Sequence, residues 1–102
     1  MFVAMNRFRV LPGAEADFED VWRKRERRLD ELPGFVDFHL LRGPANGDHT
    51  LYASHTTWRD EAAFRAWTNS EQFRAVHRQA GATKPLYAGH PELEGFTAVE
   101  GI

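Results

Sequence analysis

Three side chains that lie far apart in the sequence have the chemistry to line a pocket together: Asn6, Trp67 and His77. Asn6 stands in a segment that alternates like a β-strand, and Trp67 and His77 lie ten residues apart in a stretch with helical spacing. An imidazole can ligate the iron of haem, an indole can press on a planar macrocycle, and an amide can donate a hydrogen bond. These residue types lead to the hypothesis of a site for a flat ligand such as haem.

Each of the three residues also has an ordinary structural explanation. A histidine on an apolar helical stripe, or a large tryptophan, belongs more often to the core than to a site. Asn6 stands between Ala4 and Phe8 on the face that is predicted to point inward, where an unpaired amide costs about 1–3 kcal/mol. Its partner is either a helix end or neighbouring strand, or a bound ligand, and the residues alone leave both explanations open.

Composition limits the classes of protein to which the chain can belong. Its 102 residues, 42% of them hydrophobic, predict a single domain over residues 1–102. Thirteen basic against fifteen acidic residues argue against a nucleic-acid partner, and the absence of cysteine excludes disulfides and thiol catalysis. No apolar run approaches the roughly 18 residues of a membrane span, and no signal-peptide pattern is found, so we expect no membrane partner and a cytoplasmic location.

Apolar spacing predicts the elements that must position the three residues. They are a strand over residues 2–10, a helix over 14–32, strands over 35–42 and 51–58, a helical region over 61–80 and a strand over 93–99. Asn46-Gly47 predicts a hairpin between the two middle strands, and Ser70 is expected to cap a second helical segment. Residues 81–91 contain Pro85 and Pro91 and are predicted to form a long loop, a typical place for a functional lid.

The resulting β-α-β-β-α-β order predicts a ferredoxin-like α+β sandwich with its helices on one face of the sheet. The other face carries apolar residues, including Val3 and Met5. Because an exposed apolar sheet face is a liability, we expect two copies to pair through it as a homodimer. The alternative is a monomer with an open, partly polar face, since Arg7 and Arg9 lie on the same side.

No stronger motif competes with the three residues, since the chain has no P-loop, GxGxxG, HExxH or GxSxG segment. The other histidines show no close cluster of the kind that binds zinc or non-haem iron, although distant residues could still converge; they are His39, His49, His55 and His90. The acidic residues near the start of the first helix suit the helix dipole and need no catalytic role; they are Asp17, Glu19 and Asp20. Glu19 is expected to pair with Arg23 one turn later.

The segment Trp58-Arg59-Asp60-Glu61-Ala62-Ala63-Phe64-Arg65-Ala66-Trp67, with the later Phe73 and His77 and with Asn6, resembles the IsdG-type haem-degrading monooxygenases. These belong to the broader antibiotic-biosynthesis-monooxygenase group of dimeric α+β barrels. The resemblance covers roughly residues 2–80. The aromatic segment is shared with the broader group, whereas the set of Asn6, Trp67 and His77 distinguishes the haem-degrading type.

The resemblance implies a role for each site residue. His77 is implied as the axial ligand of the haem iron, and Asn6 as a hydrogen-bond partner of the iron-bound oxygen or the porphyrin on the distal side. Trp67 is implied to force the macrocycle out of plane, and Phe64 and Phe73 to contact it. Haem is then both cofactor and substrate: O2 and an external electron donor open the ring to a bilin-type product and iron is released. A homodimer and an unidentified reductase are the implied partners.

After His77 the sequence departs from the family pattern, so residues 80–91 receive no family role. Arg74, Arg78 and Lys84 could pair with haem propionates, or be plain surface cations. Two other functions stay open: a cofactor-independent monooxygenase acting on an electron-rich, quinol-type aromatic, and a haem-binding or trafficking protein without catalysis. The identity of the bilin and of the electron donor is not set by the sequence.

Overall fold

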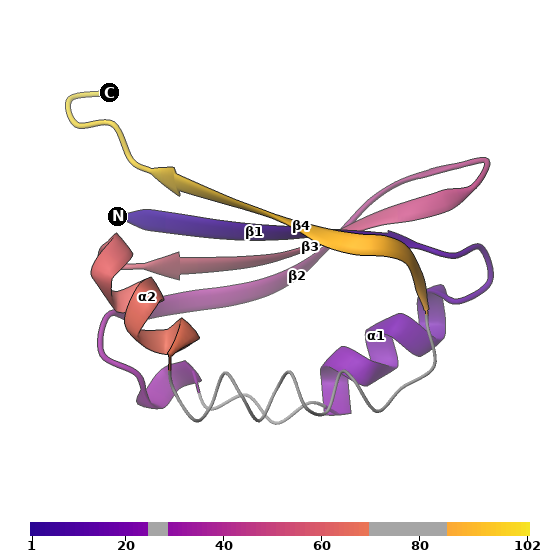
Figure 1. Cartoon of the computed structure of the whole chain (residues 1–102), viewed down its shortest axis with the longest axis horizontal. Coiled ribbons are helices and arrows are strands. Elements are labelled where there is room, and N and C mark those ends of the chain that lie inside the picture. Colours follow the sequence, from indigo (N-terminus) through magenta and orange to yellow (C-terminus); the bar gives the residue numbers. More distant parts are fainter. Residues whose placement is uncertain (25–28, 70–85) are drawn as a thin grey trace.

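The fold is a four-stranded sheet with its helices on one side (Figure 1). The computed structural model describes residues 1–24, 29–69 and 86–102. In chain order the elements are β1 (Phe2–Val10), α1 (Glu15–Lys24), the 3₁₀ helix η1 (Leu29–Glu31), β2 (Phe35–Asn46), β3 (His49–Trp58), α2 (Glu61–Thr68) and β4 (Tyr87–Thr97). The ferredoxin-like α+β prediction is confirmed.

The sheet is antiparallel throughout, with strand order β2-β3-β1-β4. The alternation along β1 decides which face each side chain occupies. Phe2 and Phe8 are buried beneath the helices, whereas Met5 and Arg7 point to the opposite face and are half-buried. We call this opposite side the open face. Asn6 is on the helix side, as its place in the alternation predicts.

Among the described residues, the core beneath the helices forms two clusters. The α1 cluster contains Phe8, Val10, Phe18, Trp22, Tyr52 and Leu86. The α2 cluster contains Phe2, Ala4, Leu29, Trp58 and Ala63. Phe38 packs against both. Along β1, Ala4 belongs to the α2 cluster and Phe8 to the α1 cluster, so Asn6 stands at the junction of the two.

The helix predicted over residues 14–32 differs from the structure at its C-terminal end. Residues 29–31 form the 3₁₀ helix η1, in which the Leu32 amide donates to the Leu29 carbonyl at 2.9 Å. The physical reason is packing: Leu29 is buried in the α2 cluster rather than in the α1 cluster. The prediction of a helix that continues to Leu32 was therefore wrong in its last turn.

The long loop predicted over residues 81–91 is also wrong in part, because β4 begins at Tyr87. β4 is an edge strand, and its register with β1 shifts between Arg7 and Arg9. An edge position and a register shift are where a strand tolerates proline, which explains how Pro91 fits. Gly89 has a positive φ of 68°, a backbone conformation that favours glycine. Residues 81–85 lie outside the described residues.

The remaining boundaries follow the sequence prediction closely. The predicted hairpin between β2 and β3 is confirmed, with both strands reaching further than expected and Asn46 opposite His49. The predicted start of α2 is confirmed as well, and Asp60 caps it by accepting a hydrogen bond from the Ala63 amide at 2.9 Å. The expected cap at Ser70 lies outside the described residues. Neither of the described helices is long and apolar enough to cross a membrane.

Candidate functional site

Asn6 carries a polar atom that the described residues leave without a partner. Its Oδ1 is buried and accepts no hydrogen bond from any described residue. Ser54 on β3 and Leu93 on β4 stand opposite it in the sheet. A buried amide oxygen without a partner costs about 1–3 kcal/mol. Because rotation about χ2 exchanges the oxygen and the nitrogen of an amide, this position can present either an acceptor or a donor to a ligand.

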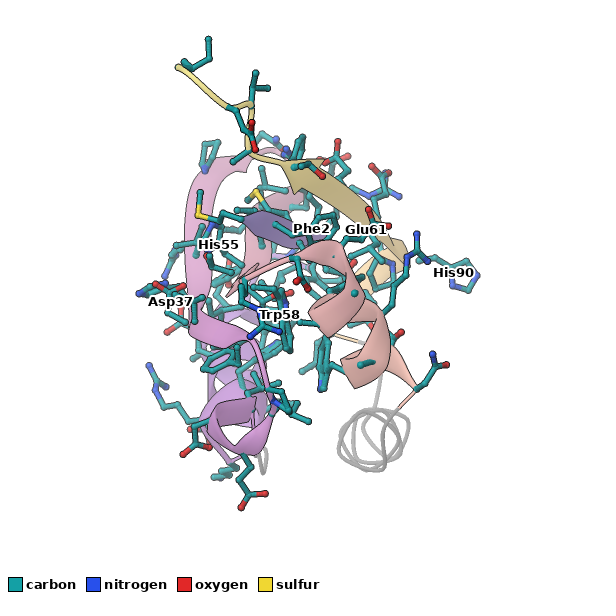
Figure 2. All side chains as sticks on the ribbon, turned by 90° about the vertical axis from the view of Figure 1, so that its left-hand side faces the viewer. Phe2, Asp37, His55, Trp58, Glu61 and His90 are labelled. Atoms are coloured by element: carbon teal, nitrogen blue, oxygen red, sulfur yellow. The ribbon has the colours of Figure 1, made fainter. Side chains whose placement is uncertain are left out.

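Trp67 lies on the same side of the sheet as Asn6, near the end of α2. It is half-buried, and its ring stacks on Trp58 with centroids 5.5 Å apart and planes at 28°. The ring centroid of Phe64 lies 6.0 Å from that of Trp67 and 5.3 Å from that of Phe2. Figure 2 shows Phe2 and Trp58 beside α2. Trp67 and Phe64 thus form one aromatic wall, built from the α2 cluster.

The structure therefore places three of the predicted site residues, Asn6, Phe64 and Trp67, on the helix side of the sheet. His77 and Phe73 lie outside the described residues, as do the three cations named as propionate partners. The convergence of Asn6, Trp67 and His77 on one cavity thus stays a prediction. An inward amide on the same side of the sheet as an aromatic wall suits a planar, largely apolar ligand.

A hollow of about 600 Å³ lies between α1 and the strands β2 and β3. Its lining residues are Glu19, Trp22, Arg23, Phe38, His39, Leu40, Arg42 and Tyr52. Trp22 stacks on Phe38 with ring centroids 5.6 Å apart. The hollow is thus apolar where these rings meet and charged at Glu19 and the two arginines.

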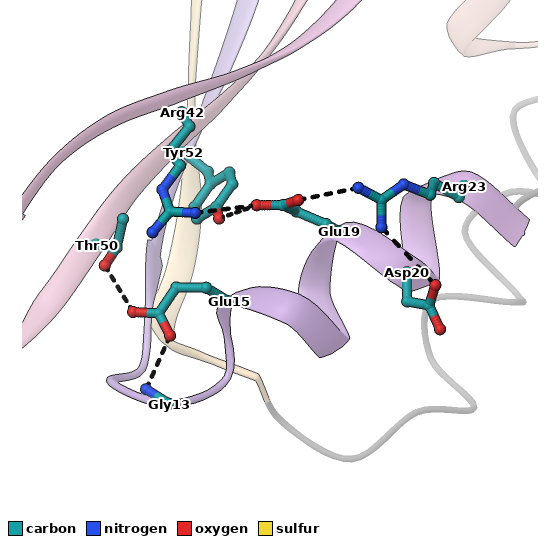
Figure 3. Close-up of polar contacts among 8 residues, drawn as sticks. All are labelled: Gly13, Glu15, Glu19, Asp20, Arg23, Arg42, Thr50 and Tyr52. Atoms are coloured by element: carbon teal, nitrogen blue, oxygen red, sulfur yellow. Dashed lines mark hydrogen bonds and ion pairs between the residues drawn. The ribbon is translucent and has the colours of Figure 1, made fainter.

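Glu19 is the centre of the polar contacts at this hollow (Figure 3). The Tyr52 hydroxyl donates to Glu19 Oε2 at 2.5 Å, Arg42 Nη1 lies 3.4 Å from the same oxygen, and Arg23 Nη2 donates to Oε1 at 3.1 Å. The hydrogen bond from Tyr52 is the main cause that lowers the pKa of Glu19. Burial is the main cause that raises the pKa of Tyr52 to about 12, and the hydrogen bond to Glu19 is the second.

Glu15 makes a second link from α1 to β3. It accepts hydrogen bonds from the Thr50 hydroxyl at 2.8 Å and from the Gly13 amide at 2.9 Å. A backbone hydrogen bond within Glu15 itself, followed by the bond from Thr50, lowers its pKa. The predicted Glu19–Arg23 pair is confirmed, but the contact of Glu19 with the sheet was missed. The available signal was the pair of polar residues, Thr50 and Tyr52, that alternate onto the inward face of β3.

Three potential metal ligands come together on the open face, a convergence that the sequence left open. One ligand atom each from Asp37, His39 and His55 lies within 4.8 Å of the others. The sequence carried a signal in Asp37 and His39, which are two residues apart and so share a strand face. Only the register between β2 and β3 brings His55 to them.

The amino-acid sequence of the chain is similar to a known family and to a characterised enzyme. The family model described as "Antibiotic biosynthesis monooxygenase" matches residues 1–79. The chain is 33% identical over 93 residues to the mycobilin-producing heme oxygenase of Mycobacterium tuberculosis, an alignment that covers 90% of this chain and 84% of that protein.

Two solved structures extend the similarity over nearly the whole chain. The heme-degrader MhuD from Mycobacterium tuberculosis, solved with two hemes bound in its active site, has a TM-score of 0.72 and 31% identity, covering 100% of this chain and 99% of that one. The cofactor-independent oxygenase SnoaB from Streptomyces nogalater has a TM-score of 0.69 and 29% identity, covering 97% and 93%. The relatives thus include oxygenases that act with and without haem.

Proposed function

The chain belongs to the antibiotic biosynthesis monooxygenase family, and from that premise we propose that it is a haem-degrading monooxygenase. It binds haem as both substrate and cofactor on the helix side of the sheet. With O2 and an external electron donor it opens the porphyrin ring, and the products are iron and a bilin-type tetrapyrrole. The similarity to a heme oxygenase over 90% of the chain supports this function.

The observation that carries the proposal is the buried, unpartnered oxygen of Asn6. A purely structural amide at this position is expected to bond to a helix end or a neighbouring strand, and no described residue provides that bond. A ligand that enters between the two core clusters removes the cost of the unpaired amide. The aromatic wall formed by Trp67 and Phe64 suits the flat face of a porphyrin.

The roles of the site residues follow the family resemblance. His77 would hold the haem iron, and a neutral imidazole would favour its reduction. Asn6 would donate or accept a hydrogen bond at the bound ligand, and Trp67, Phe64 and Phe73 would contact the porphyrin. When bound, haem supplies the redox chemistry, while these side chains orient it and exclude water.

Haem titration tests the proposal directly. We expect haemin to give a Soret band typical of histidine ligation, and ascorbate with O2 to bleach that band. His77→Ala should remove the ligated spectrum, whereas His90→Ala, which changes an exposed histidine of β4, should leave both binding and bleaching intact. A Soret band that persists under turnover would rule out haem degradation.

The similarity to SnoaB favours a second candidate, a cofactor-independent oxygenase that acts on a quinol-type aromatic. This candidate predicts no haem ligation and O2 consumption with a quinol in metal-free buffer. A third candidate, a haem carrier without catalysis, predicts a Soret band that forms normally and survives reductant and O2. The same titration therefore separates all three functions.

The proposal extends to assembly and location. We propose a homodimer of the α+β barrel type, in the cytoplasm, that receives electrons from a cellular reductase. The open face supports dimerisation, because Val3 stands there opposite Phe96, a residue that is 48% exposed, and Met5 lies on the same face. A second copy of the same face would cover these residues with a matching apolar surface.

A further inference from the structure

Two histidines and an aspartate gather on the open face of the sheet. Asp37 and His39 stand two residues apart on β2, and the register with β3 places His55 directly opposite His39. The intervening Phe38 packs against the core beneath the helices, so its two neighbours point to the open face. Figure 2 shows Asp37 and His55 near each other on one side of the molecule, with His90 on the other.

The three side chains are close together, but the distance between Asp37 and His39 is too long for a hydrogen bond. One ligand atom of each residue lies within 4.8 Å of the others, and the rings of His39 and His55 have centroids 6.2 Å apart. Asp37 Oδ1 is 4.0 Å from His39 Nδ1, which is too long for a hydrogen bond. His55 Nδ1 is buried and has no hydrogen-bond partner among the described residues.

We propose that Asp37, His39 and His55 bind a divalent transition-metal ion. Two imidazoles and one carboxylate form a donor set that suits Zn²⁺ and the related first-row ions, with the remaining positions filled by water. Ligand atoms about 2.0–2.1 Å from a tetrahedral ion lie about 3.3 Å apart, so these atoms must approach by at most about 1.5 Å. In the single chain the side chains of His39 and Asp37 are 59% and 50% exposed, so a change of rotamer can bring them toward His55.

An ordinary Asp–His ion pair explains the cluster less well. A pair with both side chains at least half exposed contributes about 0–1 kcal/mol, and it gives no role to His55. A metal ion uses all three side chains at once. Within residues 1–24, 29–69 and 86–102, this is the one group of three such ligands that comes together.

The site does not depend on haem, because it lies on the opposite face of the sheet from Asn6 and Trp67. It shares the open face with the residues proposed to pair two copies, since His55 stands opposite Met5, so the ion would be held at the edge of that dimer interface. Calorimetric titration of the haem-free, full-length chain with Zn²⁺ tests the site. The informative variants are His39→Ala and His55→Ala. The matched controls are His90→Ala, on the exposed edge strand, and His77→Ala, which removes the imidazole proposed for haem.

We expect one Zn²⁺ per chain, with affinity lowered at least about tenfold in His39→Ala and in His55→Ala and unchanged in both controls. Asp37→Asn keeps the shape of the side chain while removing its charge, so it should weaken zinc binding and shift the visible absorption of bound Co²⁺ without altering the circular dichroism. Absence of binding by the wild type, wild-type affinity in both alanine variants, or loss of binding in His77→Ala instead, would overturn the proposal.

Discussion

Asn6 is the residue at which stability and function are expected to oppose each other. Its buried oxygen has no partner among the described residues, so Asn6→Leu should raise the free energy of unfolding of the haem-free protein by about 1 kcal/mol. The same substitution removes the amide proposed to face haem and should slow ring opening at least about tenfold. Chemical denaturation and the rate of Soret loss measure the two effects.

Thr56→Val is the matched control for Asn6. Thr56 is buried on the same face, but its hydroxyl has a partner, the carbonyl of Ala4 at 3.4 Å. Losing that bond should lower the free energy of unfolding by about 1 kcal/mol and leave turnover unchanged. If Asn6→Leu destabilises the protein as Thr56→Val does and leaves turnover intact, Asn6 is a structural amide.

The Tyr52–Glu19 hydrogen bond predicts a pH-dependent contribution to stability. The bond lowers the pKa of Glu19 in the folded state below its ordinary value of 4.5. A carboxyl with a lowered pKa stabilises the fold above its unfolded pKa, and that stabilisation is lost as the pH falls through the folded pKa. The stability gap between wild type and Tyr52→Phe should thus be largest near neutral pH and shrink below 4.5. Denaturation across an acid pH series checks this, and a gap that stays constant would contradict it.

At the scale of elements, Gly34 holds the turn into β2 against α2. Its φ is +82°, and a Cβ there would lie 2.5 Å from the Ala63 Cβ. Gly13 has a φ of +85°, and a Cβ added there would have no atom within 4 Å. Its substitution therefore measures the cost of the positive φ alone, without a steric clash. We expect Gly13→Ala to cost about 1 kcal/mol of unfolding free energy and Gly34→Ala about 1–3 kcal/mol more. Thermal and urea denaturation of both variants tests this; equal losses would show that α2 can move aside.

The elements with strong local patterns were predictable, and those decided by distant contacts were not. β1 alternates along most of its length, and α2 begins after the Asp60 cap, so both were placed correctly. The helix predicted to reach Leu32 gives way to η1 because Leu29 is captured by the α2 cluster. The start of β4 was missed because Gly89 and Pro91 look like loop residues, and only pairing with β1 makes them strand.

The site residues, too, were predictable only where a local sequence pattern places them. The inward position of Asn6 could be predicted from alternation, and that of Trp67 from helical spacing. The contacts of Glu19 with β3, and the cluster of Asp37, His39 and His55, depend on register and on packing between elements. A single sequence without those pairings gives no distance between such residues.

At the scale of the whole molecule, the open face predicts the oligomeric state. The chain has a mass of 11.7 kDa, and light scattering should give twice that value for the wild type. Phe96→Asp places a charge opposite Val3 on the open face and should shift the protein to the monomer. Val99→Asp changes a residue that is 73% exposed beyond the end of β4, and it should remain dimeric. A wild type that is monomeric, or a dimer that survives Phe96→Asp, would contradict pairing through this face.

Haem degradation by this chain is best checked by the mass of the tetrapyrrole formed from one equivalent of bound haem under ¹⁸O2 with ascorbate. We expect an open-chain, bilin-type product that carries ¹⁸O, together with free iron that a ferrous chelator captures. Recovery of haem with unchanged mass and its iron retained would show that the chain does not degrade haem.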